Sequence, residues 1–201
     1  MVESKYIEIK ELKEYATNNN VPIMLDKGLD FLTSFILKNN INRVLEIGTA
    51  IGYSAIIMAL TNPNLKVTSI ERDNERYLEA LKNIKKFNLE DRITLIFKDA
   101  LEVNLDETYD LLFIDAAKGQ NINFFKRFIG NIKQNGFVIT DNMEFHGLVA
   151  KDENEIKSRN LRGLVRKIKD YIVFLNDSLD YETSYYSIGD GLAVTRKKNK
   201  N

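Results

Sequence analysis

The chain contains no cysteine, which excludes disulfides, thiolate catalysis and cysteine-ligated zinc. This composition suits a reducing compartment. No uninterrupted apolar run reaches the roughly 18 residues that a membrane span needs, and the N-terminus is charged rather than signal-like. We therefore expect a cytoplasmic protein without a membrane partner.

The chain also lacks net charge, because 29 Lys and Arg balance 29 Asp and Glu. A polyanionic partner would therefore need a local basic patch. With 201 residues, 44% of them hydrophobic, the chain can bury a full core, and it shows no linker or repeat. We predict one domain spanning residues 1–201, with the helices of residues 1–40 covering the functional site. The basic end, residues 196–201, is expected to fray.

Strand and helix patterns alternate from Arg43 onward. Before that point, helices are expected at residues 4–17 and from Asp26, which is placed to cap the second helix. The predicted strands are 43–47, 66–70, 92–97, 109–114 and 136–140, with helices at 52–61, 73–88, 120–133 and 154–176. Residues 181–195 are typical of a hairpin. The pattern predicts an α/β fold whose parallel sheet is covered on both faces and extended by this hairpin at one edge.

The stretch RVLEIGTAIGYSAIIM, residues 43–58, joins an apolar strand to an apolar helix through a turn with two glycines. Gly48 and Gly52 allow a ligand to approach the backbone closely, and the helix start favours a negatively charged group. Glu71 ends the next strand, about 20 residues further on, where an acid can accept both hydroxyls of a ribose. Taken alone, Glu71 is explained equally well as a surface residue that only caps a loop. The turn and the acid together indicate a nucleoside ligand.

Polar residues follow every predicted parallel strand: Glu46 and Gly48, then Glu71, Asp99 and Ala100, Asp115, and Asp141 and Asn142. Such strand ends meet at one rim of the sheet, where ligands bind. Asp115, Asp141 and Asn142 offer three hard oxygen ligands for Mg²⁺ or a similar cation. Lys118 is close enough in sequence to act as a base or electrostatic partner. A single Asp of this kind more often caps a loop, but the set favours a site.

Taken together, these residues resemble the metal-dependent S-adenosylmethionine O-methyltransferases of the catechol and caffeoyl-CoA type. The matching segments are VLEIGTAIGYSA, VTSIERD, Asp99–Ala100, FIDAAKGQ, ITDNM and IGDGLAV. The resemblance implies a Rossmann-like class I methyltransferase fold, with a mostly parallel seven-stranded sheet and an antiparallel C-terminal strand. Within this family, the segments VPIM, DAAKGQ and DYETS resemble bacterial tRNA 5-hydroxyuridine methyltransferases, which make 5-methoxyuridine at the wobble position.

The resemblance also implies a role for each residue. S-adenosylmethionine would contact Val21, Glu46, Gly48, Ser54, Glu71, Asp99, Ala100 and Asp115. Asp115, Asp141 and Asn142 would hold Mg²⁺ or another divalent cation, and Lys118 would assist deprotonation with Asp115 as the second catalytic residue. His146, the only histidine, is expected in a loop over the site. Relatives are commonly homodimers, so we expect the same here.

Three features bear on the substrate. Arg159, Arg162, Arg166 and Lys169 share one face of the late helix, where they and Lys118 could contact RNA phosphates. A solvated face paired with local acids is an equally good reading of that spacing. Asn121 stands where the family usually has an aromatic residue, and Ser187 where catechol enzymes carry an acid. We expect a tRNA anticodon substrate; the alternatives are a small catechol or phenol, and a non-catalytic nucleoside-binding module.

Overall fold

The computed structural model describes residues 3–198. Its helices are α1 (Glu3–Asn18), α2 (Asp26–Lys38), α3 (Tyr53–Thr61), α4 (Asn74–Lys86), α5 (Asn121–Phe128) and α6 (Arg159–Asn176). Its strands are β1 (Arg43–Ile47), β2 (Lys66–Glu71), β3 (Ile93–Phe97), β4 (Tyr109–Ile114), β5 (Ile132–Thr140), β6 (Tyr181–Tyr186) and β7 (Leu192–Lys197). Four short 3-10 helices complete the elements: η1 (Ala100–Glu102), η2 (Lys118–Gln120), η3 (Ile129–Asn131) and η4 (Glu153–Glu155). Within these residues, no helix combines the length and the apolarity of a membrane span.

The strands of the described part form one sheet in the order β3-β2-β1-β4-β5-β7-β6. Strands β1 to β5 pair in parallel, whereas β7 pairs antiparallel with both β5 and β6. The chain crosses from β3 to β4 on the other side of β1, which creates a switch point at the carboxyl ends of β1 and β4. The sequence prediction of a mostly parallel Rossmann-like sheet with an antiparallel C-terminal hairpin is confirmed.

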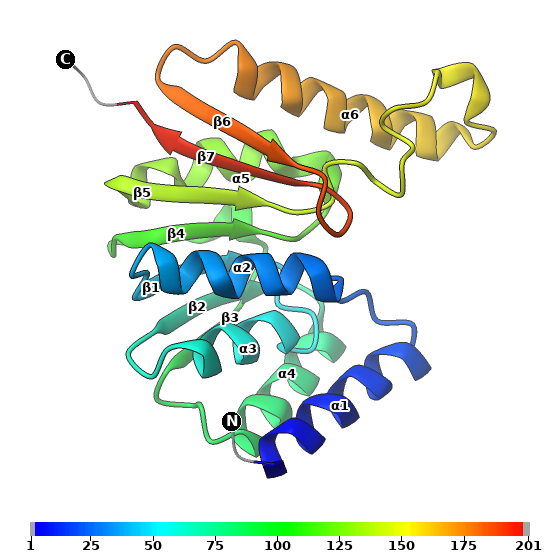
Figure 1. The fold of residues 1–201 in the computed structure, drawn as a ribbon. Coiled ribbons are helices and arrows are strands. Elements are labelled where there is room, and N and C mark those ends of the chain that lie inside the picture. Colours follow the sequence, from blue (N-terminus) through cyan, green and yellow to red (C-terminus); the bar gives the residue numbers. More distant parts are fainter. Residues whose placement is uncertain (1–2, 199–201) are drawn as a thin grey trace.

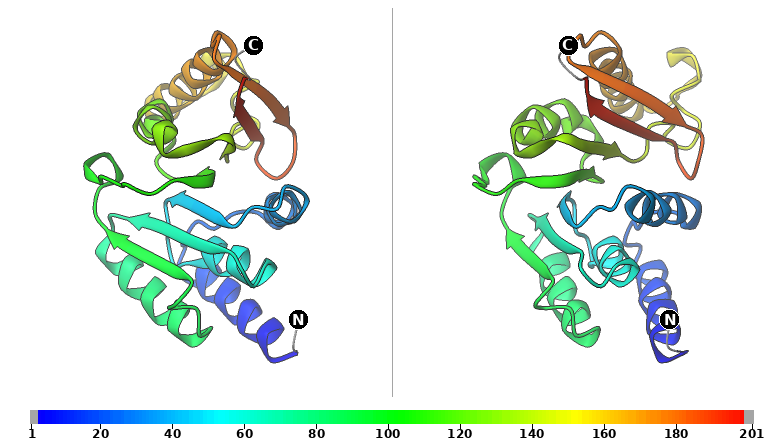
Figure 2. Two further views of the ribbon diagram at one scale, coloured as in Figure 1. Left: turned by 90° about the vertical axis from the view of Figure 1, so that its left-hand side faces the viewer. Right: turned by 60° about the vertical axis from the view of Figure 1, so that its left-hand side comes forward.

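Helices cover both faces of the sheet (Figures 1 and 2). Alternate strand residues point to opposite faces, so Val44 joins the core beneath α1 to α4, while Leu45 joins the core beneath α5 and α6. The phenylalanines of α5, predicted as core, are buried there. In Figure 1, α2 crosses in front of the sheet and α5 lies behind it. Two cores therefore hold the sheet rigidly between layers.

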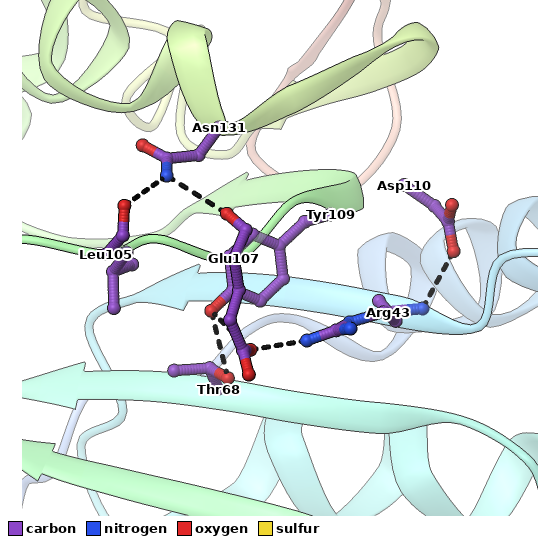
Figure 3. A network of polar contacts seen from close by, with 7 residues as sticks. All are labelled: Arg43, Thr68, Leu105, Glu107, Tyr109, Asp110 and Asn131. Carbon is purple, nitrogen blue, oxygen red and sulfur yellow. Dashed lines mark hydrogen bonds and ion pairs between the residues drawn. The ribbon is translucent and has the colours of Figure 1, made fainter.

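A polar network secures the amino ends of the central strands (Figure 3). The carboxylate of Asp110 accepts the backbone N–H groups of Asn42 and Arg43 at 2.9 Å each, and the Arg43 guanidinium pairs with Glu107. The Asn131 side-chain amide donates to the backbone carbonyls of Leu105 and Glu107, in the connection before β4. These contacts lie at the opposite end of the sheet from the ligand rim, so they support the register rather than the chemistry.

Two predictions about helix ends are wrong. Asp26 does not cap α2: the N-cap position is Leu25, which makes no side-chain cap bond, and the Asp26 carboxylate instead pairs with Lys13 at 2.5 Å. The helix predicted at 120–133 ends at Phe128. The strand after it, predicted at 136–140, begins at Ile132, because β5 continues through an irregularity in its register with β4.

The start of α6 and the end of β7 differ from prediction as well. Helix α6 begins at Arg159, where the Ser158 hydroxyl accepts from Leu161 N–H, so residues 154–158 lie outside it. Arg196 and Lys197 were expected to fray, but they finish β7, because Arg196 pairs with both β5 and β6 and Lys197 pairs with β6. Residues 199–201 of that predicted tail lie outside the described part.

Candidate active site

A cavity of about 530 Å³ opens where the parallel strands end. It is lined by the residues that follow β1, β2, β3, β4 and β5, and by the hairpin turn before β7. The α1–α2 connection, residues 22–25, closes one side, whereas neither of these two helices lines the cavity. One rim therefore gathers the polar residues that the sequence places at the strand ends.

The glycine turn after β1 passes directly against the end of β4. Gly48 adopts φ +98°, and a Cβ there would lie 2.2 Å from the carbonyl oxygen of Asp115. Gly52 adopts φ +85° at the start of α3, and Ala50 between them is also left-handed at φ 48°. Only glycine fits at Gly48, because both the backbone conformation and the close contact exclude a side chain.

Glu46 is fully buried and does not line the cavity, although the family resemblance places it among the cofactor contacts. Its carboxylate accepts the Ser54 hydroxyl at 2.5 Å and the Ser69 hydroxyl. Burial raises the pKa of Glu46 to about 7 against the effect of these donors. Ser54 lines the cavity, so Glu46 influences the site indirectly, by fixing the orientation of the Ser54 hydroxyl.

Glu71, at the tip of β2, holds its carboxylate in one orientation. Oε2 accepts Ala50 N–H at 2.8 Å, and Oε1 accepts the N–H groups of Arg72 and Asp73 at 2.9 Å. The carboxylate lines the cavity beside Asp99 and Ala100. Oε2 accepts only one of these donors, so it keeps acceptor capacity for a further one, such as a ligand hydroxyl.

Asp115, Asp141 and Asn142 meet at the ends of β4 and β5. The Asn142 side-chain nitrogen lies 3.1 Å from Asp115 Oδ1 and 3.0 Å from Asp141 Oδ2. Burial and, next in size, the negative charge of Asp115 together raise the pKa of Asp141 to about 7. Burial also raises the pKa of Asp115, which the positive charge of Lys118 opposes. The buried Asp141 and the half-buried Asp115 place two acids at one point, which calls for a cation.

The chemistry of this set fits a hard divalent cation. Turning the Asn142 amide would place its oxygen between the two carboxylates, giving three oxygen ligands. Within residues 3–198, no cluster of three or more His, Cys, Asp or Glu offers another metal site. Asn142 itself adopts φ 63°, which directs its side chain back toward the end of β4.

Lys118 and His146 also line the cavity. Lys118 begins η2, and its Nζ lies 5.6 Å above the centre of the Phe145 ring. His146 follows Phe145 in the loop after β5, and its side chain is 72% exposed. The Asp190 carboxylate, from the hairpin turn, lies behind His146 with Oδ2 3.5 Å from Nδ1. Sequence reasoning missed Asp190, because only the sheet order brings the hairpin turn to this rim.

Several predicted residues lie away from the cavity. Val21 is a partly buried core residue, whereas its neighbours Pro22 to Leu25 line the cavity. Asn121 is buried in α5 and Ser187 is exposed, and neither lines the cavity. Tyr53 is among the lining residues that the prediction missed, and no sequence signal marked it, because it has the apolar pattern of α3.

The basic face of α6 contacts the loop before it. Arg166 pairs with Glu153 at 2.7 Å, Arg162 donates to the carbonyl of Ile156 at 2.6 Å, and Lys169 donates to the carbonyl of Lys151 at 3.3 Å. Arg159 is exposed at the first position of the helix. Three of these four cations therefore hold residues 151–156 in place, and none lines the cavity.

Comparisons with known proteins point to one enzyme family. The sequence model of the O-methyltransferase family matches residues 2–198. A caffeoyl-CoA O-methyltransferase from Populus kitakamiensis is 30% identical over 94% of this chain and 86% of its own length. A Staphylococcus aureus structure provisionally described as a caffeoyl-CoA O-methyltransferase shares 40% identity, with a TM-score of 0.90 over 94% of this chain and 92% of that one.

A Bacillus cereus O-methyltransferase, solved in complex with SAH, has the same fold at 23% identity, with a TM-score of 0.81 over 95% of this chain and 90% of that chain. The family match spans almost the whole sequence, and the curated relative is covered over most of its length. The chain, with its rim of strand-end acids around one cavity, belongs to the O-methyltransferase family.

Proposed function

We propose that this protein is an O-methyltransferase that uses S-adenosylmethionine and a divalent cation to methylate 5-hydroxyuridine at the wobble position of tRNA. The observation that carries the metal-dependent chemistry is the meeting of Asp115, Asp141 and Asn142 beside a cavity that also holds Glu71. A nucleoside cofactor and a cation would then share one cavity.

The chain's residues divide into two groups along the cavity. Gly48 and Ser54 would receive the methionine end of the cofactor, Glu71 its ribose hydroxyls, and Asp99 and Ala100 its adenine. S-adenosylmethionine supplies an electrophilic methyl group when bound. Glu46 keeps Ser54 oriented from below. This half of the site would therefore bind S-adenosylmethionine and fix its orientation.

The second group prepares the accepting oxygen. Asp115, Asp141 and Asn142 would hold Mg²⁺ or a similar cation, which lowers the pKa of a hydroxyl that it contacts. Lys118 adds a positive charge next to Asp115 and can stabilise the deprotonated hydroxyl or take up its proton. Positioning and charge stabilisation then supply the catalysis.

Basic residues at the cavity favour an RNA substrate. Arg72, Arg76, Lys98 and Lys118 line it together with the acids described above, and Arg72 lies 3.4 Å from Asp99. The start of α6, with Arg159, Arg162 and Arg166, lies at the end of the sheet where the parallel strands finish (Figure 1). Phosphates flanking an inserted base would meet these cations. The protein is electroneutral overall, so this local arrangement matters more than total charge.

The second candidate is a phenol of the catechol or caffeoyl type. It is favoured by the names of the relatives at 30–40% identity, which are caffeoyl-CoA O-methyltransferases. The same residues would perform the same chemistry on a smaller acceptor. The two candidates differ only in what lies beyond the reacting hydroxyl.

A methylation assay distinguishes them. Purified protein is given S-adenosylmethionine and either a hydroxyuridine-bearing anticodon stem-loop, caffeoyl-CoA or a simple catechol, each with and without a chelator. We expect rapid, chelator-sensitive methylation of the RNA. Methylation of only the phenols would replace the RNA proposal, and turnover that resists the chelator would contradict the cation's role.

A further inference from the structure

The Asp190 side chain is the least satisfied acid at the cavity. It lies in the hairpin turn and is only 7% exposed. Oδ1 accepts the backbone N–H of His146, but Oδ2 is buried and has no hydrogen-bond partner within the described residues. An unpaired buried oxygen of this kind is destabilising, so the arrangement points to a partner.

The nearest candidate partner is the His146 ring. Its Nδ1 lies 3.5 Å from Asp190 Oδ2, just beyond the usual length of a hydrogen bond. The ring is otherwise largely exposed and lines the cavity, with the Phe145 ring at 5.5 Å. One ring nitrogen therefore faces Asp190, and Nε2 remains available.

The backbone around His146 is held in an unusual conformation. Phe145, His146 and Gly147 adopt φ values of 46°, 55° and 75°. The hairpin turn braces this segment, because Glu144 N–H donates to the Asp190 carbonyl at 2.8 Å and Met143 N–H donates to the Gly191 carbonyl at 2.9 Å. Consecutive left-handed residues persist only where their surroundings enforce them, and they concentrate at functional sites.

We propose that Asp190 is a positioning residue that presents His146 to the substrate. Asp190 Oδ2 accepts Nδ1–H, which fixes the neutral imidazole in one tautomer and leaves Nε2 as a hydrogen-bond acceptor at the cavity. His146 then orients the ring that carries the reacting hydroxyl. The pair sets substrate specificity, separate from the residues that hold the cation.

The identity of the matching donor rests on the proposed function. In 5-hydroxyuridine, the imide N3–H lies on the same ring edge as the 5-hydroxyl, with the C4 carbonyl between them. A simple catechol carries no ring N–H. An acceptor at His146 therefore favours the pyrimidine over the phenol.

The tautomer can be observed directly, because His146 is the only histidine. We would record long-range ¹H–¹⁵N spectra of protein with ¹⁵N-labelled histidine, at a pH where the ring is neutral. The wild type should show Nδ1–H. Asp190→Asn should shift the ring to Nε2–H, because the amide donates to Nδ1, and the matched exposed change Asp106→Asn should leave the tautomer unaltered. A wild-type Nε2–H tautomer, or no change in Asp190→Asn, would overturn the pair.

A double-mutant cycle tests the positioning role. For the hydroxyuridine stem-loop, His146→Ala should lower kcat/KM roughly tenfold, the worth of one hydrogen bond. Asp190→Asn should lower kcat/KM by about the same factor, and the double variant should lose no more than His146→Ala alone. Additive losses would mean that Asp190 only braces the loop, and would overturn the proposal. If the wild type methylates no RNA, the proposed function fails, and the spectra alone then decide whether the pair exists.

A modified substrate tests the donor. N3-methylation of the hydroxyuridine should reduce wild-type kcat/KM by a factor similar to that of His146→Ala, and should change nothing further in that variant. Equal losses in both proteins would refute the N3–H contact.

Discussion

Glu46 is a fully buried acid that serves the cavity without lining it. Two serine hydroxyls donate to it, yet burial raises its pKa to about 7. The folded protein therefore keeps this proton up to about pH 7, whereas the unfolded chain releases it near the ordinary value of 4.5. Between these values the native state binds more protons, so its stability falls as the pH rises.

Glu46→Gln should remove this dependence. At about 1.4 kcal/mol per pKa unit, Glu46 makes the free energy of unfolding about 3 kcal/mol lower at pH 8 than at pH 4.5. Gln keeps the shape and can still bond to both serines. Denaturant titrations of the two proteins between pH 4.5 and 8 measure the difference, and parallel pH profiles would disprove this role for Glu46.

Gly48→Ala should destabilise the protein by about 3 kcal/mol or more, because its Cβ would overlap the Asp115 carbonyl and φ is +98°. Gly130→Ala is the matched control, since a Cβ there meets nothing within 4 Å. We expect the control to change the free energy of unfolding by less than about 1 kcal/mol. Thermal and denaturant unfolding give both numbers, and similar values for the two variants would contradict the close packing of the turn.

At the scale of elements, α6 carries both a structural and a proposed binding role. Its basic face was predicted from spacing alone, and the structure shows that Arg162, Arg166 and Lys169 contact the preceding loop. Alanine at these positions would release the loop as well as remove charge. A test of RNA binding must therefore separate the two effects.

The Glu153–Arg166 pair allows this separation. Both Arg166→Ala and Glu153→Gln break the ion pair, but only the first removes the cation. We expect Arg166→Ala to weaken RNA binding and to lower the salt slope by about one. Glu153→Gln should bind as well as wild type or better. Fluorescence anisotropy across salt concentrations measures this, and equal losses in both variants would assign Arg166 a purely structural role.

At the scale of the whole molecule, a bound cation should stabilise the fold, because it offsets the repulsion between the carboxylates of Asp115 and Asp141. A hundredfold excess of Mg²⁺ over its dissociation constant contributes about 2.7 kcal/mol, which raises the melting temperature of a chain this size by roughly 5–10 °C. Asp141→Ala should abolish both this shift and turnover, while calorimetry should still detect S-adenosylmethionine binding. An equal Mg²⁺ shift in the variant, or loss of cofactor binding regardless of Mg²⁺, would contradict this division of the site.

The cores and the sheet follow from local patterns. Apolar runs of five or six residues, separated by helical periodicity, predicted every parallel strand to within a few residues, with the largest difference at β5. The failures came where a local signal was ambiguous. Residues 133–135 of β5 are exposed and polar, so they lack the apolar run of a buried strand, and Asp26 is a capping residue that Lys13 engages instead.

Sequence alone was enough to place an acid at the end of four of the five parallel strands, because side-chain alternation and turn residues act over a few positions. It could not reveal which distant groups meet: Asn142 between two aspartates, Ser69 beneath Glu46, or Asp190 behind His146, 44 residues away. Those contacts depend on sheet order and register. Both are set by the burial of whole strands and helices against one another, a property that no single segment carries.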